Sequence, residues 1–272
     1  MDCELKLPPA ASDVQLLSVH SRDYVEKIIH GKLSPLEERR IGFPWSPEMV
    51  ERSRRSTGAT IAAGRSALRD SVACNLAGGT HHAFSDNGQG YCVFNDVCVA
   101  IKSLQGEGLI QSAIVIDCDV HQGNGTASIA AHDESIFAMS IHCEKNYPFQ
   151  KTNGDLDVAL PPGTNDDAYL AALATHASPL FNKINPDIVF YLAGADPFQG
   201  DRLGLLSLTK QGLKQRDEFV ISSCRSRQIP LAICMAGGYA PDVEDIVDIH
   251  FSTVANAYQH FSKGPFHPES GR

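Results

Sequence analysis

Four short, nearly continuous apolar runs mark the second half of the chain: "SAIVID", "IFAMSIH", "DIVFYLAGAD" and "PLAICMAGGY". Runs of this kind are typical of parallel strands that are covered on both faces. They alternate with helical patterns at 166–184 and 209–227, and a last helical pattern covers 243–261. This alternation predicts a three-layer α/β/α protein with a mostly parallel central sheet.

The first half of the chain has a helical pattern. We expect one helix over 14–31, capped by Ser12 and Asp13, and a long helix over 48–73 that is opened by Ser46 and Pro47. A Pro-rich loop, "GFPWSPE", separates them. The chain has no low-complexity linker or internal repeat, so we expect a single domain over 1–272.

Composition and charge narrow the class of protein. The 272 residues are 43% hydrophobic and 20% charged, which is ordinary for a soluble globular domain. The net charge of −9 argues against direct binding of nucleic acid, which requires a basic face. No apolar run reaches the length of a membrane span. The eight cysteines form no C-x-x-C pair, which favours a reduced, cytoplasmic protein.

Polar side chains follow each apolar run directly. The first run ends in Asp117, Asp119 and His121, and the other three lead to Ser140 and His142, to Asp196 and to "GGY" at 237–239. Parallel α/β sheets bind ligands at the carboxyl ends of their strands. The sequence therefore predicts a functional site at this edge of the sheet.

The first polar cluster indicates a metal. Asp117, Asp119 and His121 stand at alternate positions of an extended segment, so their side chains can point the same way. Beside apolar walls they require a cation, and carboxylates with imidazole suit zinc or iron(II). Asp196 is the best further ligand from another strand end. The alternative is that these acids belong to a loop that caps a helix.

Two further clusters carry candidate catalytic groups. His81 and His82 follow a Gly-Gly pair, and near a metal they could act as general base and general acid. Tyr239 follows two glycines and could donate to a developing oxyanion. Alternatively, the histidines are incidental and the tyrosine is a packed aromatic at a turn.

The segments "THHA", "DCDVHQGNGT", "AGADPFQGDRLG" and "GGY" resemble, in this order, the histone deacetylase superfamily, which has the arginase-like α/β fold. The "HQGN" variant and the loop "SIHCEKNYPF" look most like class IV deacetylases and their bacterial relatives. The resemblance implies a zinc-dependent amidohydrolase that removes acetyl or longer acyl groups from lysine side chains. Iron(II) could replace zinc, and potassium would be structural.

The resemblance also assigns roles to residues. Asp119, His121 and Asp196 match the zinc ligands, and Tyr239 matches the oxyanion tyrosine. His82 matches the base, while His81 matches its electrostatic or acid partner. The remaining matches are Asp117 and Ser140 at a potassium site, Asn124 behind His82, the tunnel walls Tyr91 and Tyr147, the neighbouring Gly90 and Gly238, and the rim residue Leu203.

The chain departs from the family at its start, because nothing resembles the strand that opens relatives. We therefore expect the domain to lack that edge strand, either because its start is truncated or because this member dispenses with the strand. Two other functions stay open at this point. One is deacylation of small acylated amines such as acetylpolyamines, which an acid at the tunnel mouth would favour, with Glu144 as a weak candidate. The other is a non-catalytic protein that binds acyl-lysine.

Overall fold

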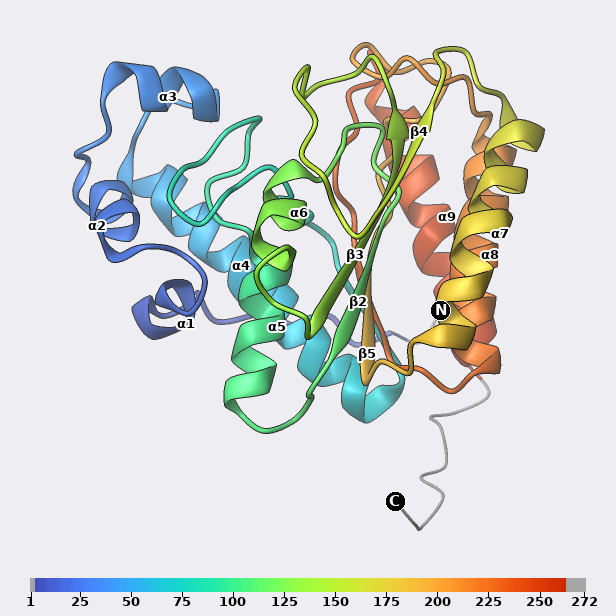
Figure 1. The fold of residues 1–272 in the computed structure, drawn as a ribbon, viewed down its shortest axis with the longest axis horizontal. Coiled ribbons are helices and arrows are strands. Elements are labelled where there is room, and N and C mark those ends of the chain that lie inside the picture. Colours follow the sequence, from blue (N-terminus) through green and yellow to red (C-terminus); the bar gives the residue numbers. More distant parts are fainter. Residues whose placement is uncertain (1–2, 263–272) are drawn as a thin grey trace.

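The apolar runs form a parallel sheet in the computed structural model, which describes residues 3–262 (Figure 1). Within those residues the sheet has six strands in the order β1-β6-β5-β2-β3-β4, and every neighbouring pair is parallel. The strands are β1 (Val72–Asn75), β2 (Ala113–Asp117), β3 (Ile136–Cys143), β4 (Leu156–Leu160), β5 (Ile188–Leu192) and β6 (Leu231–Cys234). The prediction of a mostly parallel α/β sheet is confirmed.

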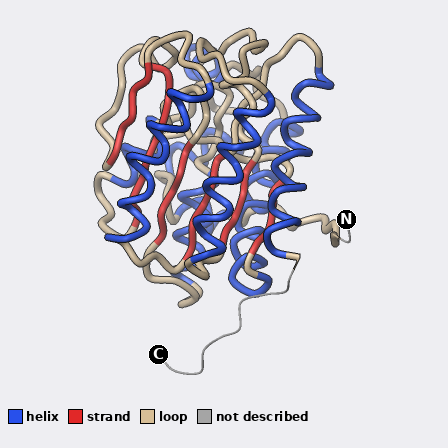
Figure 2. Tube along the Cα trace, turned by 90° about the vertical axis from the view of Figure 1, so that its right-hand side faces the viewer, coloured by secondary structure: helices blue, strands red, loops and turns tan. Residues whose placement is uncertain are grey.

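Helices cover both faces of the sheet, giving three layers (Figure 2). On one face lie α4, α5 and the short α6, with α1 to α3 outside them; α7, α8 and α9 lie on the other face (Figure 1). The bounds are α1 (Asp13–Leu17), α2 (Arg22–His30), α3 (Pro35–Ile41), α4 (Pro47–Asp70), α5 (Asp96–Gly106), α6 (Asn124–Ala130), α7 (Asp166–Lys183), α8 (Lys210–Ser226) and α9 (Val243–Phe261). No helix in the described range is long and apolar enough to cross a membrane.

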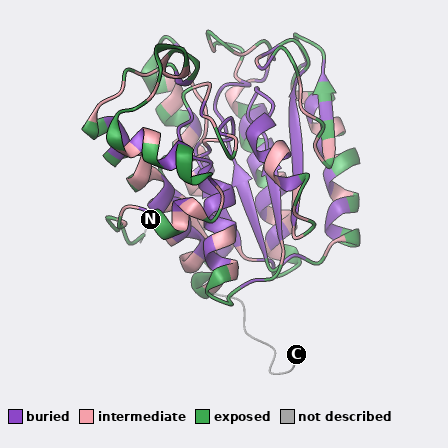
Figure 3. Cartoon of the chain, turned by 60° about the vertical axis from the view of Figure 1, so that its left-hand side comes forward, coloured by how far each residue is buried: buried purple, intermediate pink, exposed green. Residues whose placement is uncertain are grey.

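Burial of alternate side chains on opposite faces of the strands builds two hydrophobic cores. In β2, Ile114 and Ile116 pack in the core under α7, α8 and α9, whereas Ala113 and Val115 pack in the core under α4 and α5. The central strands β2, β5 and β6 are consequently buried on both sides (Figure 3). This explains why their sequences are continuous apolar runs and do not alternate.

Two predicted helices have different bounds in the structure. The segment expected as one helix over 14–31 is two helices. Ser21 caps a new helix that begins at Arg22, by accepting from the Tyr24 amide, and the buried His20 turns inward to accept a hydrogen bond from the Asn95 amide. The long helix ends at Asp70 and not at 73. Ser71, with φ of 74°, terminates it, and the following residues form β1.

Candidate metal and catalytic site

The polar strand ends lie at one edge because the strands run in register. Asp117 of β2 pairs with Ser140 of β3 and with Leu192 of β5, and Leu192 pairs with Cys234 of β6. Cys234 in turn pairs with Asn75, the last residue of β1. The segments that follow these positions, which carry the predicted site residues, therefore emerge from the same edge of the sheet.

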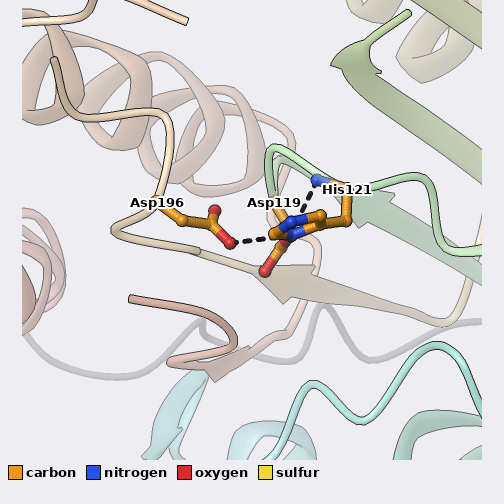
Figure 4. Close-up of side chains that lie close together, drawn as sticks. All are labelled: Asp119, His121 and Asp196. Carbon is orange, nitrogen blue, oxygen red and sulfur yellow. Dashed lines mark hydrogen bonds and ion pairs between the residues drawn. The ribbon is translucent and has the colours of Figure 1, made fainter. Parts of the chain in front are cut away.

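Asp119, His121 and Asp196 form a buried cluster at this edge (Figure 4). Their candidate ligand atoms all lie within 4.8 Å of one another. Nδ1 of His121 is 2.9 Å from Oδ1 of Asp119 and 3.1 Å from Oδ2 of Asp196. The candidate ligands that follow β2 and β5 are thus brought together, although 75 residues separate His121 from Asp196 in the sequence.

The donor set fits a divalent cation. Two carboxylates share this buried space with one imidazole, so full ionisation leaves excess negative charge without a bound cation. Burial and the neighbouring Asp119 raise the pKa of Asp196 to about 7. Burial lowers the pKa of His121, but hydrogen bonds and charges from both carboxylates outweigh it and raise the pKa to about 11. Carboxylate and imidazole ligands of this number are those that zinc or iron(II) binds with an open position.

The backbone around the cluster fixes its carboxylates. The Val120 amide donates to Oδ1 of Asp196 at 2.9 Å, and the Gly237 amide donates to Oδ2 of Asp119 at 2.8 Å. A Cβ atom at Gly237 would collide with both carboxylates. The first of the two glycines before Tyr239 is therefore required by the close approach of the backbone to the candidate ligands.

The two adjacent histidines lie beside the cluster, each with a different partner. Nδ1 of His81 is 2.6 Å from Oδ2 of Asp117, and Nδ1 of His82 is 2.7 Å from Oδ1 of Asn124. Their ring centroids are 4.1 Å apart. One imidazole thus faces a carboxylate and the other faces a neutral amide.

These partners separate the pKa values of the two imidazoles. Burial lowers the pKa of His81, but the charges of Asp117 and Asp119 outweigh it and raise the pKa to about 9. Burial and the charge of His81 lower the pKa of His82 well below its ordinary value, and the Asn124 amide does not offset this. Neighbouring groups with separated pKa values can divide acid and base roles.

Asp96, which was not among the predicted site residues, holds the loop that carries the histidines. This fully buried carboxylate at the start of α5 accepts hydrogen bonds from the Gly79 amide at 3.0 Å and from the Thr80 amide at 2.7 Å. The hydroxyls of Thr60 and Thr80 also donate to it. The signal in the sequence is an Asn-Asp pair at the end of the same Gly-rich segment.

Tyr239 approaches the cluster from the loop after β6. Its backbone amide donates to Asp201 at 2.6 Å, and its carbonyl accepts from Nε of Arg202 at 3.0 Å. Its ring centroid lies 6.3 Å from that of His121. Burial, with the charges of Asp119 and Asp196, raises the pKa of Tyr239 above its ordinary value, so the phenol keeps its proton.

A cavity of about 460 Å³ leads from the surface to these groups. His82, His121 and Tyr239 are among the residues that line it. The ring of Tyr147 stands perpendicular to that of His82 at 4.9 Å between centroids, and its hydroxyl donates to Gln89. Of the predicted tunnel residues, the cavity lining includes Gly90, Tyr91, Tyr147 and Leu203. Gly238 instead faces Ala195 and Ile246.

The predicted potassium residues occupy neighbouring strands. The carboxylate of Asp117 binds His81 through Oδ2 and accepts from the Asp119 amide through Oδ1 at 3.1 Å. Ser140, opposite Asp117 in the sheet, has its hydroxyl 3.0 Å from Nδ1 of His142. Both side chains are buried beside the site.

A second supporting network, absent from the prediction, lies behind the metal cluster. Nη1 of the fully buried Arg216 donates to the carbonyls of Cys118 at 3.2 Å and Gly194 at 2.6 Å, which lie just before the candidate ligands. Asp217 neutralises the guanidinium and accepts hydrogen bonds from Tyr191 and Thr253. Its signal in the sequence is an Arg-Asp pair on the apolar face of α8.

Comparison with known proteins agrees with this architecture. A crystal structure of an HDAC homolog from Aquifex aeolicus superposes with a TM-score of 0.76 at 24% identity, covering 97% of this chain and 80% of that one. This similarity concerns the fold. A structure of the HDA15 HD domain gives a TM-score of 0.78 at 21% identity, covering 97% of this chain and 78% of that one.

Sequence comparison identifies the family. An uncharacterized protein of Picosynechococcus sp. is 46% identical over 232 residues, which are 85% of this chain and 77% of that protein. Histone deacetylase 2 of Arabidopsis thaliana is 30% identical over 249 residues, and this chain spans 62% of its length. The histone deacetylase domain model matches residues 2–254. The chain therefore belongs to the histone deacetylase family.

Proposed function

We propose that this protein is a zinc-dependent lysine deacylase, which hydrolyses the amide between an acetyl or longer acyl group and a lysine side chain. The observation that carries the proposal is that the buried cluster of Asp119, His121 and Asp196 reaches, through His121, a cavity that His82 and Tyr239 also line. The same three ligands suit iron(II) as an alternative metal. Residues 1–272 would act as one catalytic domain.

In this proposal, Asp119, His121 and Asp196 would hold zinc, which would supply the Lewis acidity that polarises the substrate carbonyl and lowers the pKa of a water molecule. His82 takes the proton of the attacking water, because it lines the cavity and its other nitrogen is held by the neutral Asn124 amide. His81, held by the Asp117 carboxylate with a raised pKa, is the electrostatic or acid partner, and its positive charge favours the developing oxyanion. Tyr239 donates its phenol hydrogen to the developing oxyanion, and a proton then passes to the leaving lysine amine.

The residues that line the cavity suit an acyl-lysine side chain. Tyr91 and Tyr147 would flank the aliphatic lysine stem, and Gly90 leaves room between them. A Cβ atom at Gly90 would lie 2.6 Å from Cδ2 of His82, so a larger residue would close the path to the base. We also propose that Asp117 and Ser140 contribute to a potassium site that keeps the β2 end rigid.

The test is hydrolysis by the zinc-loaded protein of matched acetyl-, octanoyl- and myristoyl-lysine peptides. We expect Tyr239→Phe to lower kcat by about 10²–10³ while zinc remains bound. Tyr258→Phe, the same change in α9 away from the cavity, is the matched control and should retain full activity. The preferred peptide would give the acyl length. If a protein with one zinc per chain releases no acyl group from any of these peptides, the proposal is wrong.

A further inference from the structure

The mouth of the cavity carries positive charge. Besides the two site histidines, the basic side chains that line it are Arg39, Arg40 and Lys145. The described residues that line the cavity include no aspartate or glutamate. The two arginines come from α3 and the lysine from the loop after β3, so separate elements place charge of one sign at the same opening.

These cations have no carboxylate partner in the part of the chain that the structure describes. Ion pairs neutralise other exposed cations, such as Lys27 with Asp23 and Glu37, and Lys210 with Asp245 and Asp248. No such pair involves the three mouth cations. The dipole of α3 favours basic residues in its last turn, but it does not account for Lys145 on another element.

Nearby carboxylates are directed elsewhere. Glu37 accepts hydrogen bonds from the N-cap Ser34, and Asp201 accepts from the backbone amides of Leu203, Gly204 and Tyr239. Glu144, the sequence candidate for a polyamine-binding acid, does not line the cavity, whereas the adjacent Lys145 does. The mouth is therefore positive although the chain has a net charge of −9.

We infer that the mouth recognises an acyl-lysine within an acidic peptide segment, an inference that rests on the proposed deacylase function. With the acyl chain in the cavity, aspartate or glutamate residues flanking the lysine come near Arg39, Arg40 and Lys145. The exposed side chains of Phe149 and Leu203 offer apolar surface to the same segment. A polyamine or a lysine-rich tail would instead bring like charges together, which disfavours binding.

The test compares three acetyl-lysine peptides of equal length whose flanking residues are acidic, neutral or basic. We expect kcat/KM to fall in that order, by roughly tenfold from the acidic to the neutral peptide, because two or three partly solvated ion pairs act together. High salt should reduce the difference, since it screens exposed charges. An acetylpolyamine should be a poorer substrate than the acidic peptide.

Variants of the three mouth cations test whether they cause the preference for acidic peptides. Replacing both arginines (Arg39→Gln with Arg40→Gln) should lower the ratio of kcat/KM between acidic and neutral peptides several-fold, and Lys145→Gln should lower it further. The control is Lys183→Gln with Lys214→Gln, which removes two exposed positive charges outside the cavity lining. It should leave the ratio unchanged. An equal loss in the control would overturn the inference.

Binding of the same labelled peptides, measured by fluorescence anisotropy, separates this inference from the proposed function. Hydrolysis of all three peptides at equal rates, or faster hydrolysis of the basic one, overturns the acidic preference and keeps the deacylase. Tighter, salt-sensitive binding of the acidic peptide that the arginine variants lose supports the recognition even if no peptide is cleaved. Absence of both binding and cleavage overturns both proposals.

Discussion

Replacing Arg216 with methionine tests how the fold holds the loops of the metal cluster. The guanidinium is fully buried and donates to the carbonyls of Cys118 and Gly194. It is neutralised by Asp217, whose Oδ1 lies 2.9 Å from Nε and 2.8 Å from Nη2. The variant Arg216→Met keeps most of the volume but removes the charge and every donor.

The expected loss of stability follows from the carboxylate that Arg216→Met leaves without a cation. In the variant, the buried Asp217 carboxylate retains hydrogen bonds from the hydroxyls of Tyr191 and Thr253 but has no cation. Removing one partner of a buried pair typically costs about 3–5 kcal/mol. We therefore expect the free energy of unfolding to fall by that amount, a large share of the ~5–15 kcal/mol of an ordinary domain.

Urea denaturation measures this loss. Arg65→Gln, which breaks an exposed ion pair with Glu107, is the control and should cost less than about 1 kcal/mol. Adding Asp217→Asn to Arg216→Met removes the stranded charge and should restore part of the stability. This double variant should still bind zinc about 10–100-fold more weakly, because the loop carbonyls have lost their donor. A loss no greater than the control, or no recovery in the double variant, would refute the reasoning.

Three other predictions concern pH, the metal and the glycine loop. Burial lowers the pKa of His20 to about 4, so between about pH 4 and 6.5 the unfolded chain binds more protons than the folded chain. The free energy of unfolding should therefore fall as pH falls through that window, by up to ~1.4 kcal/mol per pH unit. In His20→Gln, whose amide oxygen can accept from the Asn95 amide, denaturation midpoints should vary less with pH; an unchanged slope would contradict this. Asp196→Asn should lower bound zinc, counted by elemental analysis, well below one per chain, and full retention would exclude it as a ligand. Gly237→Ala should weaken zinc binding by at least about tenfold in a chelator competition, whereas Gly106→Ala, where a methyl group meets nothing within 4 Å, should not; equal affinities would contradict the steric argument.

The sequence predicts the central strands because their burial on both faces leaves an unmistakable apolar pattern. The two edge strands were not predicted. β1 has four residues, mostly half-buried, and follows α4 with a single left-handed residue between them. β4 alternates exposed and buried positions over five residues. Edge strands are short and partly solvated, so pairing with a neighbour defines them more than their own pattern does.

The candidate ligands are predictable from the sequence because they directly follow the ends of parallel strands. A parallel sheet fixes the edge at which Asp119, His121 and Asp196 must emerge, whatever the loops do. The supporting residues have no such rule. Arg216 and Asp217 lie on a helix face that the pattern marks as apolar, and the positive mouth joins α3 to the loop after β3. Such contacts depend on packing between distant elements, which local periodicity does not encode.

The two helical layers divide the support of the site between them. Asp96, at the start of α5, holds the backbone of Gly79 and Thr80 and thereby the histidine pair, while Arg216 of α8, on the opposite face, holds the loops of the metal ligands. Both act on backbone groups and neither lines the cavity. Because the two sets of contacts share no residue, loosening one layer should disturb proton transfer and loosening the other should disturb metal binding. The residues for proton transfer and for metal binding come together at the edge of the sheet that lies between these two layers.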